Sequence, residues 1–160
     1  MAIKSITPFL WFDHQAEEAA NSYVSLFPNS RITHVSRYGD AGPGPKGSVM
    51  VVAFELDGRR FTALNGGPHH KLSEAFSLLV DCTEQADIDR LWGALSDTPN
   101  VCGWTKDRFG VSWQINYAGL PGLMTGPNAG KVMAAMMGMT KIDIRALQDA
   151  AGGSGDYKNA

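Results

Sequence analysis

The chain has 160 residues, 44% of them hydrophobic, so it can bury a sizeable core as one domain or as two small modules. Its formal net charge is −2 and no dense run of lysine or arginine occurs, which speaks against a nucleic acid or a membrane surface as partner. No apolar run approaches the roughly 18 residues that span a bilayer, and the start lacks the pattern of a signal peptide. We therefore expect a cytoplasmic protein in which Cys82 and Cys102 are reduced thiols.

The first half of the sequence predicts the element order βαβββ. Residues 3–12 are rich in β-branched and aromatic side chains, and Pro8 indicates an edge or irregular strand. Asp13 can cap a helix over residues 14–26, which carries apolar side chains at a spacing of three to four. Three more strands are expected, at residues 31–38, 48–56 and 60–65.

Two connections in this half have distinct turn chemistry. Asp57-Gly58 is a strong signal for a two-residue hairpin between the last two strands. Residues 39–47 are rich in glycine and proline, so we expect a loop there that can act as a mobile flap.

The second half repeats this order. Residues 74–81 predict a strand, and Thr83 can cap a helix whose buried stripe holds Ile88, Leu91, Trp92 and Leu95. Strands are expected at residues 101–106 and 111–117. The last of these alternates Val/Trp/Ile/Tyr with Ser/Gln/Asn, so its two faces meet different surroundings. The fold class is therefore α+β, built from two tandem βαβββ modules.

The C-terminal part predicts a loop at residues 121–130, a methionine-rich helix at 131–139 and a last helix capped by Asp143. The methionines can present a ligand surface, but packing against the body or a second subunit is favoured. The expected boundaries are 1–67 and 68–120 for the modules, 121–151 for the helical extension and 152–160 for a frayed tail.

Four motifs resemble the PhnB-like family of the vicinal oxygen chelate superfamily, which includes glyoxalase, bleomycin-resistance and dioxygenase proteins. They are Ile6 to Phe12, Tyr23 to Ser30, Leu64 to Pro68 and Cys102 to Gln114. The resemblance implies that the paired modules form a cupped mixed sheet with a ligand cavity on its concave side, in a homodimer. Whether one chain or two complete each cavity is open.

The resemblance also implies a divalent metal held by side chains from the first, fourth, fifth and eighth strands. Gln114 falls at the eighth-strand position, and aligning the two modules places Ala63 at the fourth-strand position, where it cannot ligate. The first-strand position falls near Thr7 and the fifth-strand position near Ala75 or Ser77, and Glu74 is the only nearby acid. We therefore predict no metal and no other cofactor, with Gln114 and Glu74 as the candidates if a metal does bind.

Alternation along the strands predicts which side chains line the hollow. If Gln114 faces inward, its neighbours at i±2 do so as well. The predicted cavity residues are Thr7, Phe9, Trp11, Ala63, Asn65, Ser77, Ser112, Gln114 and Asn116. Aromatic walls with a few amides and hydroxyls suit a small, partly planar organic ligand. Equally, these polar groups can satisfy one another or ordered water in a filled interior.

The leading hypothesis is a protein that binds a small organic molecule, with catalysis left open. The alternatives are a metal-dependent isomerase, lyase or dioxygenase of the glyoxalase type, and a drug-sequestering resistance protein. Members of the resembled family are often labelled 3-demethylubiquinone-9 3-methyltransferase. That activity has no support in a cofactor motif here, since Asn65-Gly66-Gly67-Pro68 does not follow a parallel strand and open a helix.

Overall fold

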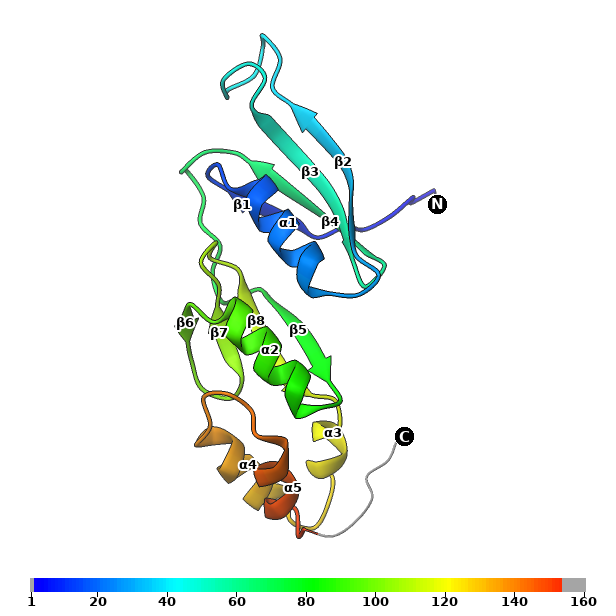
Figure 1. The fold of residues 1–160 in the computed structure, drawn as a ribbon, viewed down its shortest axis with the longest axis vertical. Coiled ribbons are helices and arrows are strands. Elements are labelled where there is room, and N and C mark those ends of the chain that lie inside the picture. Colours follow the sequence, from blue (N-terminus) through cyan, green and yellow to red (C-terminus); the bar gives the residue numbers. More distant parts are fainter. Residues whose placement is uncertain (1, 154–160) are drawn as a thin grey trace. The chain divides into compact units, whose positions relative to one another are not determined.

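A computed structural model describes residues 2–153, and the chain divides into two compact units, Met1–Leu72 and Ser73–Ala160 (Figure 1). Each unit contains one four-stranded mixed sheet and one helix that packs on it. The predicted α+β fold class, with tandem βαβββ modules and C-terminal helices, is confirmed. No helix among residues 2–153 is long and apolar enough to cross a membrane.

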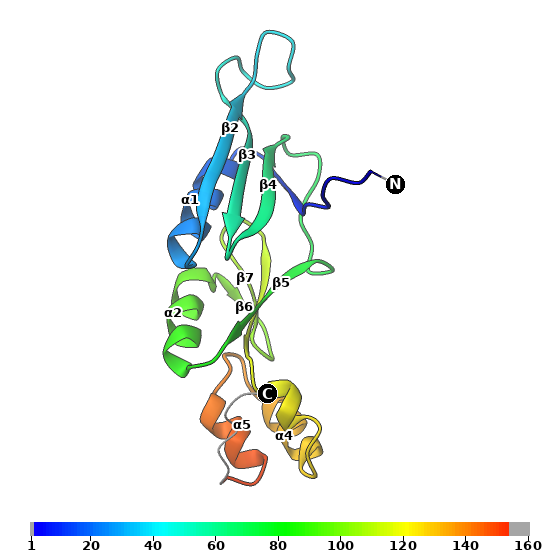
Figure 2. The ribbon, with the colours of Figure 1, turned by 90° about the vertical axis from the view of Figure 1, so that its right-hand side faces the viewer.

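The first unit is a βαβββ module. Its elements are β1 (Phe9–Phe12), α1 (Ala16–Leu26), β2 (Arg31–Arg37), β3 (Val49–Leu56) and β4 (Arg59–Asn65). The strand order is β1-β4-β3-β2, with β1 parallel to β4 and the other pairs antiparallel. Figure 2 shows α1 on one side of this sheet.

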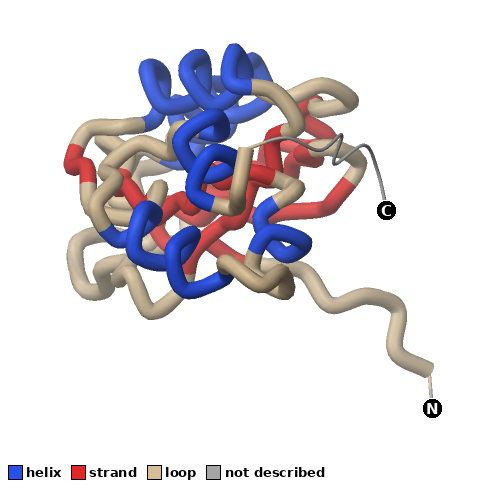
Figure 3. Tube along the Cα trace, turned by 90° about the horizontal axis from the view of Figure 1, so that it is seen from below, coloured by secondary structure: helices blue, strands red, loops and turns tan. Residues whose placement is uncertain are grey.

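The second unit repeats the module and adds helices. Its elements are β5 (Ser77–Cys82), α2 (Gln85–Leu95), β6 (Thr98–Pro99), β7 (Trp104–Lys106), β8 (Ser112–Tyr117), α3 (Leu120–Leu123), α4 (Ala129–Met137) and α5 (Ile144–Ala150). The strand order is β5-β8-β7-β6, with β5 parallel to β8. Figure 3 distinguishes the strands (red) from the helices (blue). The parallel pair thus has the same place in both sheets.

The helix-covered face of each sheet forms the core of its unit. In the first unit Tyr23 of α1 is fully buried, and its ring lies 6.4 Å from that of Phe54, which stacks on Phe61 at 5.5 Å. In the second unit Ile88 of α2 and Ile115 of β8 are both 0% exposed. Each such side chain stabilises the fold by about 1.5–3 kcal/mol relative to an exposed one.

The C-terminal helices are tied to the second module by side chains and backbone. The Gln85 amide donates to the Ile142 carbonyl and accepts from the Ile144 backbone N–H, at 3.0 and 2.9 Å. Gly103 packs where a Cβ would lie 2.6 Å from the Ile115 carbonyl oxygen. Asp143 accepts a hydrogen bond from the Ala146 N–H, so the predicted cap of α5 is confirmed.

Several predicted element boundaries were wrong. Strand β1 begins only at Phe9, so Thr7 precedes it, and β5 begins at Ser77, so Glu74 lies in a turn before it. Helix α1 begins at Ala16 without a side-chain cap from its own N-cap residue, Gln15.

The C-terminal half of the chain differs from expectation as well. The short helix α3 occupies part of the expected loop at residues 121–130, and β6 lies before the expected strand at 101–106. The predicted frayed tail falls outside the described residues apart from Gly152 and Gly153.

Candidate functional site

Each sheet has a second face, opposite its helix, which we call the first open face (first unit) and the second open face (second unit). Residues paired across neighbouring strands share a face, so the register assigns the side chains. On the first open face Phe9 pairs with Thr62, and Trp11 pairs with Leu64. The second open face is arranged in three rows across the strands.

These three rows follow from the pairing of β8 with β5 and β7. The Ser112 row holds Ser77, Ser112 and Lys106; the Gln114 row holds Leu79, Gln114 and Trp104; the Asn116 row holds Asp81 and Asn116. A hydrogen bond of 2.9 Å from the Gln114 amide to the Ser77 hydroxyl links the first two rows. The second open face therefore combines hydroxyls, an amide, an indole, an aliphatic side chain and charges of both signs.

The Ser112 hydroxyl is the least satisfied polar group on this face. Ser112 is 3% exposed, and its hydroxyl has no hydrogen-bond partner among the described residues. A buried polar group left unpaired costs about 1–3 kcal/mol, and most such groups in folded proteins are paired. An orphaned hydroxyl on an otherwise polar row is therefore a candidate contact for a bound molecule.

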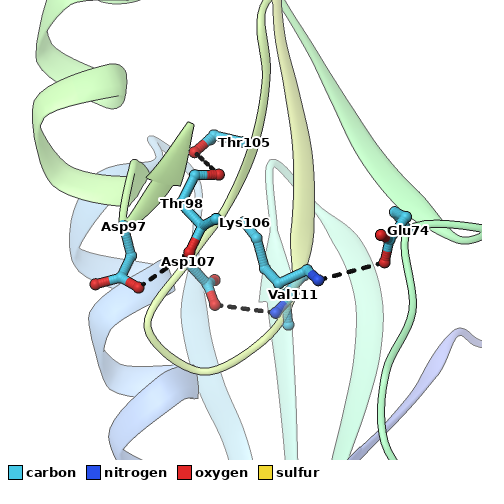
Figure 4. Close-up of polar contacts among 7 residues, drawn as sticks. All are labelled: Glu74, Asp97, Thr98, Thr105, Lys106, Asp107 and Val111. Atoms are coloured by element: carbon cyan, nitrogen blue, oxygen red, sulfur yellow. Dashed lines mark hydrogen bonds and ion pairs between the residues drawn. The ribbon is translucent and has the colours of Figure 1, made fainter. Parts of the chain in front are cut away.

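Lys106 closes one end of the Ser112 row through an ion pair. Its ammonium lies 3.3 Å from a carboxylate oxygen of Glu74 (Figure 4). A hydrogen bond from its own backbone and then the Lys106 ammonium hold the pKa of Glu74 below its usual value. Both side chains are exposed to solvent, so water screens the pair and it contributes little to stability.

The hairpin between β7 and β8 fixes where Lys106 and Ser112 stand. Asp107, 5% exposed, accepts hydrogen bonds from the backbone N–H groups of Phe109 and Val111 at 2.9 and 3.0 Å. Its second oxygen accepts from the Trp113 indole at 2.8 Å. Figure 4 shows the contact between Asp107 and Val111 at the base of this loop. An aspartate at the start of a glycine-containing turn is a recognised sequence signal for a turn, and Asp107 to Gly110 carry it.

The first open face has different chemistry. The Trp11 indole donates to the Gly67 carbonyl at 2.9 Å, and its ring passes so close to Gly66 that a Cβ there would lie 2.2 Å away. The His70 ring meets the Trp11 ring edge-on at 4.7 Å. A cavity of about 380 Å³ in this unit is lined by Thr7, Thr33, Ala53, Phe54, Glu55, Arg60, Phe61 and Thr62.

Most of the predicted cavity residues lie on the expected side of their sheets. Phe9 and Trp11 are on the first open face, and Ser77, Ser112, Gln114 and Asn116 are on the second. Thr7 lines the cavity of the first unit. That these residues contact a ligand stays a prediction.

Ala63 and Asn65 lie on the other side, so their predicted orientation was wrong. Ala63 pairs with Leu10 and is 1% exposed beneath α1. The Asn65 side chain accepts from the Ala16 N–H at 2.8 Å and donates to the Val49 carbonyl at 3.1 Å. Asn65 therefore supplies the cap that α1 lacks from its own N-cap residue.

The cause of this error is a shift of one residue in the alignment of the modules. Asn65 closes the parallel pair of the first sheet and Tyr117 closes that of the second. Counting back from these ends, Gln114 corresponds to Thr62, whereas the sequence analysis aligned it with Ala63. Because strand side chains alternate, a slip of one residue exchanges the two faces. Thr62, on the first open face, is thus the counterpart of Gln114 that the sequence alignment of the modules does not identify.

The side chains do not fit a built-in divalent metal. Within residues 2–153, no three His, Cys, Asp or Glu side chains gather closely enough to hold an ion. Gln114 offers an amide, its counterpart Thr62 a hydroxyl, and Glu74 is paired with Lys106. Divalent metals prefer carboxylate or imidazole ligands at such a site, so we derive no metal-dependent step.

The glycine-rich turn does not fit S-adenosylmethionine either. Gly66 and Gly67 follow β4, whose sheet neighbours include the antiparallel β3, and the space beside Gly66 is filled by the Trp11 ring. The glycine-rich turn of a nucleotide-binding fold leads into a helix. Here the next element after the turn is the strand β5.

These observations define an α+β protein of two tandem βαβββ modules with polar and aromatic side chains on the open faces of its sheets. Residues 4–116 match the model of the family described as 3-demethylubiquinone-9 3-methyltransferase. The chain belongs to this PhnB-like family.

Solved structures agree with this assignment. A Bacillus cereus PhnB protein, described as a putative 3-demethylubiquinone-9 3-methyltransferase, is 36% identical with a TM-score of 0.64, over 72% of this chain and 100% of that one. A Pseudomonas aeruginosa protein is 22% identical with a TM-score of 0.59, over 72% and 98% of the two chains, and shows the fold alone. Among curated proteins, none matches the chain.

Proposed function

We propose that this protein binds a small organic molecule on its second open face. The observation that carries the proposal is the buried Ser112 hydroxyl, which has no partner among the described residues. The neighbouring Gln114 amide and the Trp104 indole supply directional hydrogen bonding and a surface for a planar ring.

We propose binding and not catalysis, because the second open face does not combine the acid, base or nucleophile that a particular reaction would need. Glu74, before β5, has a lowered pKa and an ion-pair partner, so it is poorly suited to act as a general base near neutral pH. The other acid, Asp81, lies in the Asn116 row, two rows away from Ser112. The name of the Bacillus cereus relative points to methyl transfer, but the Gly66-Gly67 turn does not suit that cofactor. We expect no heat when S-adenosylmethionine is titrated into the protein in a calorimeter.

The test is a thermal-shift screen of a library of small organic compounds against three proteins. They are the wild type, Gln114→Ala, and Thr62→Val as the matched change at the corresponding position of the first sheet. The proposal expects compounds that raise the melting temperature of the wild type and of Thr62→Val, but not that of Gln114→Ala. Hits that depend on Thr62 and not on Gln114 would contradict it, as would a screen without hits.

A further inference from the structure

The three rows of the second open face differ in chemistry along β8. The Ser112 row is hydroxylic and cationic, with Lys106 directly across from Ser112. The Gln114 row places the Trp104 indole on one side of the amide and Leu79, 54% exposed, on the other. The Asn116 row carries Asp81, so the rows of Lys106 and Asp81 are about 13 Å apart, at 3.3 Å per residue.

Resting on the function proposed above, the geometry points to a ligand class: a planar aromatic acid. Its carboxylate lies in the Ser112 row and its ring in the Gln114 row. We infer further that a spacer of two carbons separates the ring from the carboxylate, as in trans-cinnamate. Adjacent rows are about 7 Å apart, which such an acid spans and benzoate does not.

The Ser112 row suits a carboxylate for three reasons. The orphaned Ser112 hydroxyl can donate to a carboxylate oxygen and so gain the partner that it lacks. The Lys106 ammonium stands on the next strand of the same face and can add a charge-assisted bond. Its present partner Glu74 is 72% exposed, so exchanging that carboxylate for one from a ligand costs little.

The Gln114 row suits a ring. Trp104 and Leu79 flank Gln114 on the neighbouring strands and offer apolar surface on both sides. A planar ring that lies over the Gln114 row can therefore contact an apolar side chain on either neighbouring strand. The reverse orientation would place the carboxylate beside Asp81, where like charges repel.

The experiment measures dissociation constants of trans-cinnamate and of its neutral amide, trans-cinnamamide, by calorimetry. Four proteins are compared: the wild type, Lys106→Gln, Ser112→Ala, and Lys131→Gln as a charge-matched control on α4. Ser112→Ala removes a buried hydroxyl that has no partner, so this variant should fold at least as stably as the wild type. Thermal unfolding of each variant verifies this.

We expect the wild type and Lys131→Gln to bind trans-cinnamate about tenfold more tightly than the amide, the usual effect of one charge-assisted hydrogen bond. Lys106→Gln should abolish that preference, and Ser112→Ala should weaken the acid several-fold. Added salt should reduce the difference in affinity between trans-cinnamate and trans-cinnamamide, because ions in solution screen the partly exposed Lys106 ammonium.

Two results would overturn the inference. Equal affinity for trans-cinnamate and trans-cinnamamide would show that the site does not recognise a carboxylate, although the protein would still bind a small molecule. Failure of both probes to bind, when library compounds do bind through Gln114, would exclude the aromatic-acid class. Failure of the proposed function itself shows separately, as a library screen without Gln114-dependent hits.

Discussion

The two units contain equivalent hairpins that reach the same result by different means. In the first unit Asp57 and Gly58 join β3 to β4 with φ angles of 47° and 72°, a two-residue turn set by the backbone. In the second unit a longer loop joins β7 to β8, and the buried Asp107 carboxylate holds it with three hydrogen bonds. The βαβββ architecture therefore does not depend on one kind of turn between its last two strands.

The open faces differ in the same way. Position 62 of the first sheet carries a threonine, and the corresponding position 114 of the second carries a glutamine bonded to Ser77. The Asp107-anchored loop also sets Lys106 opposite Ser112. These differences are the reason for proposing the ligand site on the second sheet, and the following predictions test the contrast between the units.

The largest expected effect is on the second hairpin. Asp107→Ala removes the hydrogen bonds that Asp107 accepts from the backbone N–H groups of Phe109 and Val111 and from the Trp113 indole, so the free energy of unfolding should fall by about 3 kcal/mol. Asp57→Ala, the matched change in the first hairpin, should cost about 1 kcal/mol through its left-handed backbone. Urea unfolding measures both, and equal losses would show that the hairpins are not held differently.

A smaller effect is expected at Gly66, beneath the Trp11 ring. A Cβ at this position would lie 2.2 Å from the ring, so Gly66→Ala should displace Trp11 and cost about 2 kcal/mol. Gly39→Ala is the control, since nothing lies within 4 Å of a Cβ built there. Thermal unfolding gives the stability difference; an unchanged melting temperature for Gly66→Ala would disprove the close packing.

The helix starts also distinguish the units. Asn65→Ala removes the acceptor of the Ala16 N–H, so we expect a loss of about 1 kcal/mol, as for other N-terminal caps. Glu84, the N-cap residue of α2, makes no side-chain capping bond, so Glu84→Ala should change the stability by less than about 0.5 kcal/mol. Comparable losses in urea unfolding would argue against capping by Asn65.

The smallest expected effect concerns Glu74. Its pKa is lowered from 4.5, first by a backbone hydrogen bond and then by Lys106. A lowered pKa in the folded state stabilises the fold above the unfolded pKa, and this contribution is lost as the pH falls through the folded value. Because the backbone hydrogen bond remains, Lys106→Gln should raise the pKa of Glu74 only part of the way back to 4.5. NMR titration of the Glu74 carboxyl measures it; a full return to 4.5 would show that Lys106 is the whole cause.

Local signals made much of the fold predictable. The alternation of residues 111–117, the Asp57-Gly58 pair and the Asp143 cap each concern neighbours in the sequence, and all three were predicted. The orientation of Gln114 relative to Ser112 and Asn116 followed from the same alternation.

Long-range contacts limited the prediction of the site. Asn65 binds the start of α1 and Trp11 binds the Gly67 carbonyl, and the partners lie 49 and 56 residues apart in the sequence. Alternation assigns two faces to a strand, but it does not say which residue of another module corresponds to Gln114. Alignment of the two modules by sequence therefore matches Gln114 with Ala63, whereas the strand register matches it with Thr62.

The most direct test of the assigned site is an NMR titration of the ¹⁵N-labelled protein with the strongest hit from the compound screen. We predict that the largest chemical-shift changes occur at the Gln114 side-chain amide and the Trp104 indole, with smaller changes at Trp11. Shifts concentrated on Trp11 and the Thr62 backbone would place the ligand on the first sheet and contradict the assignment.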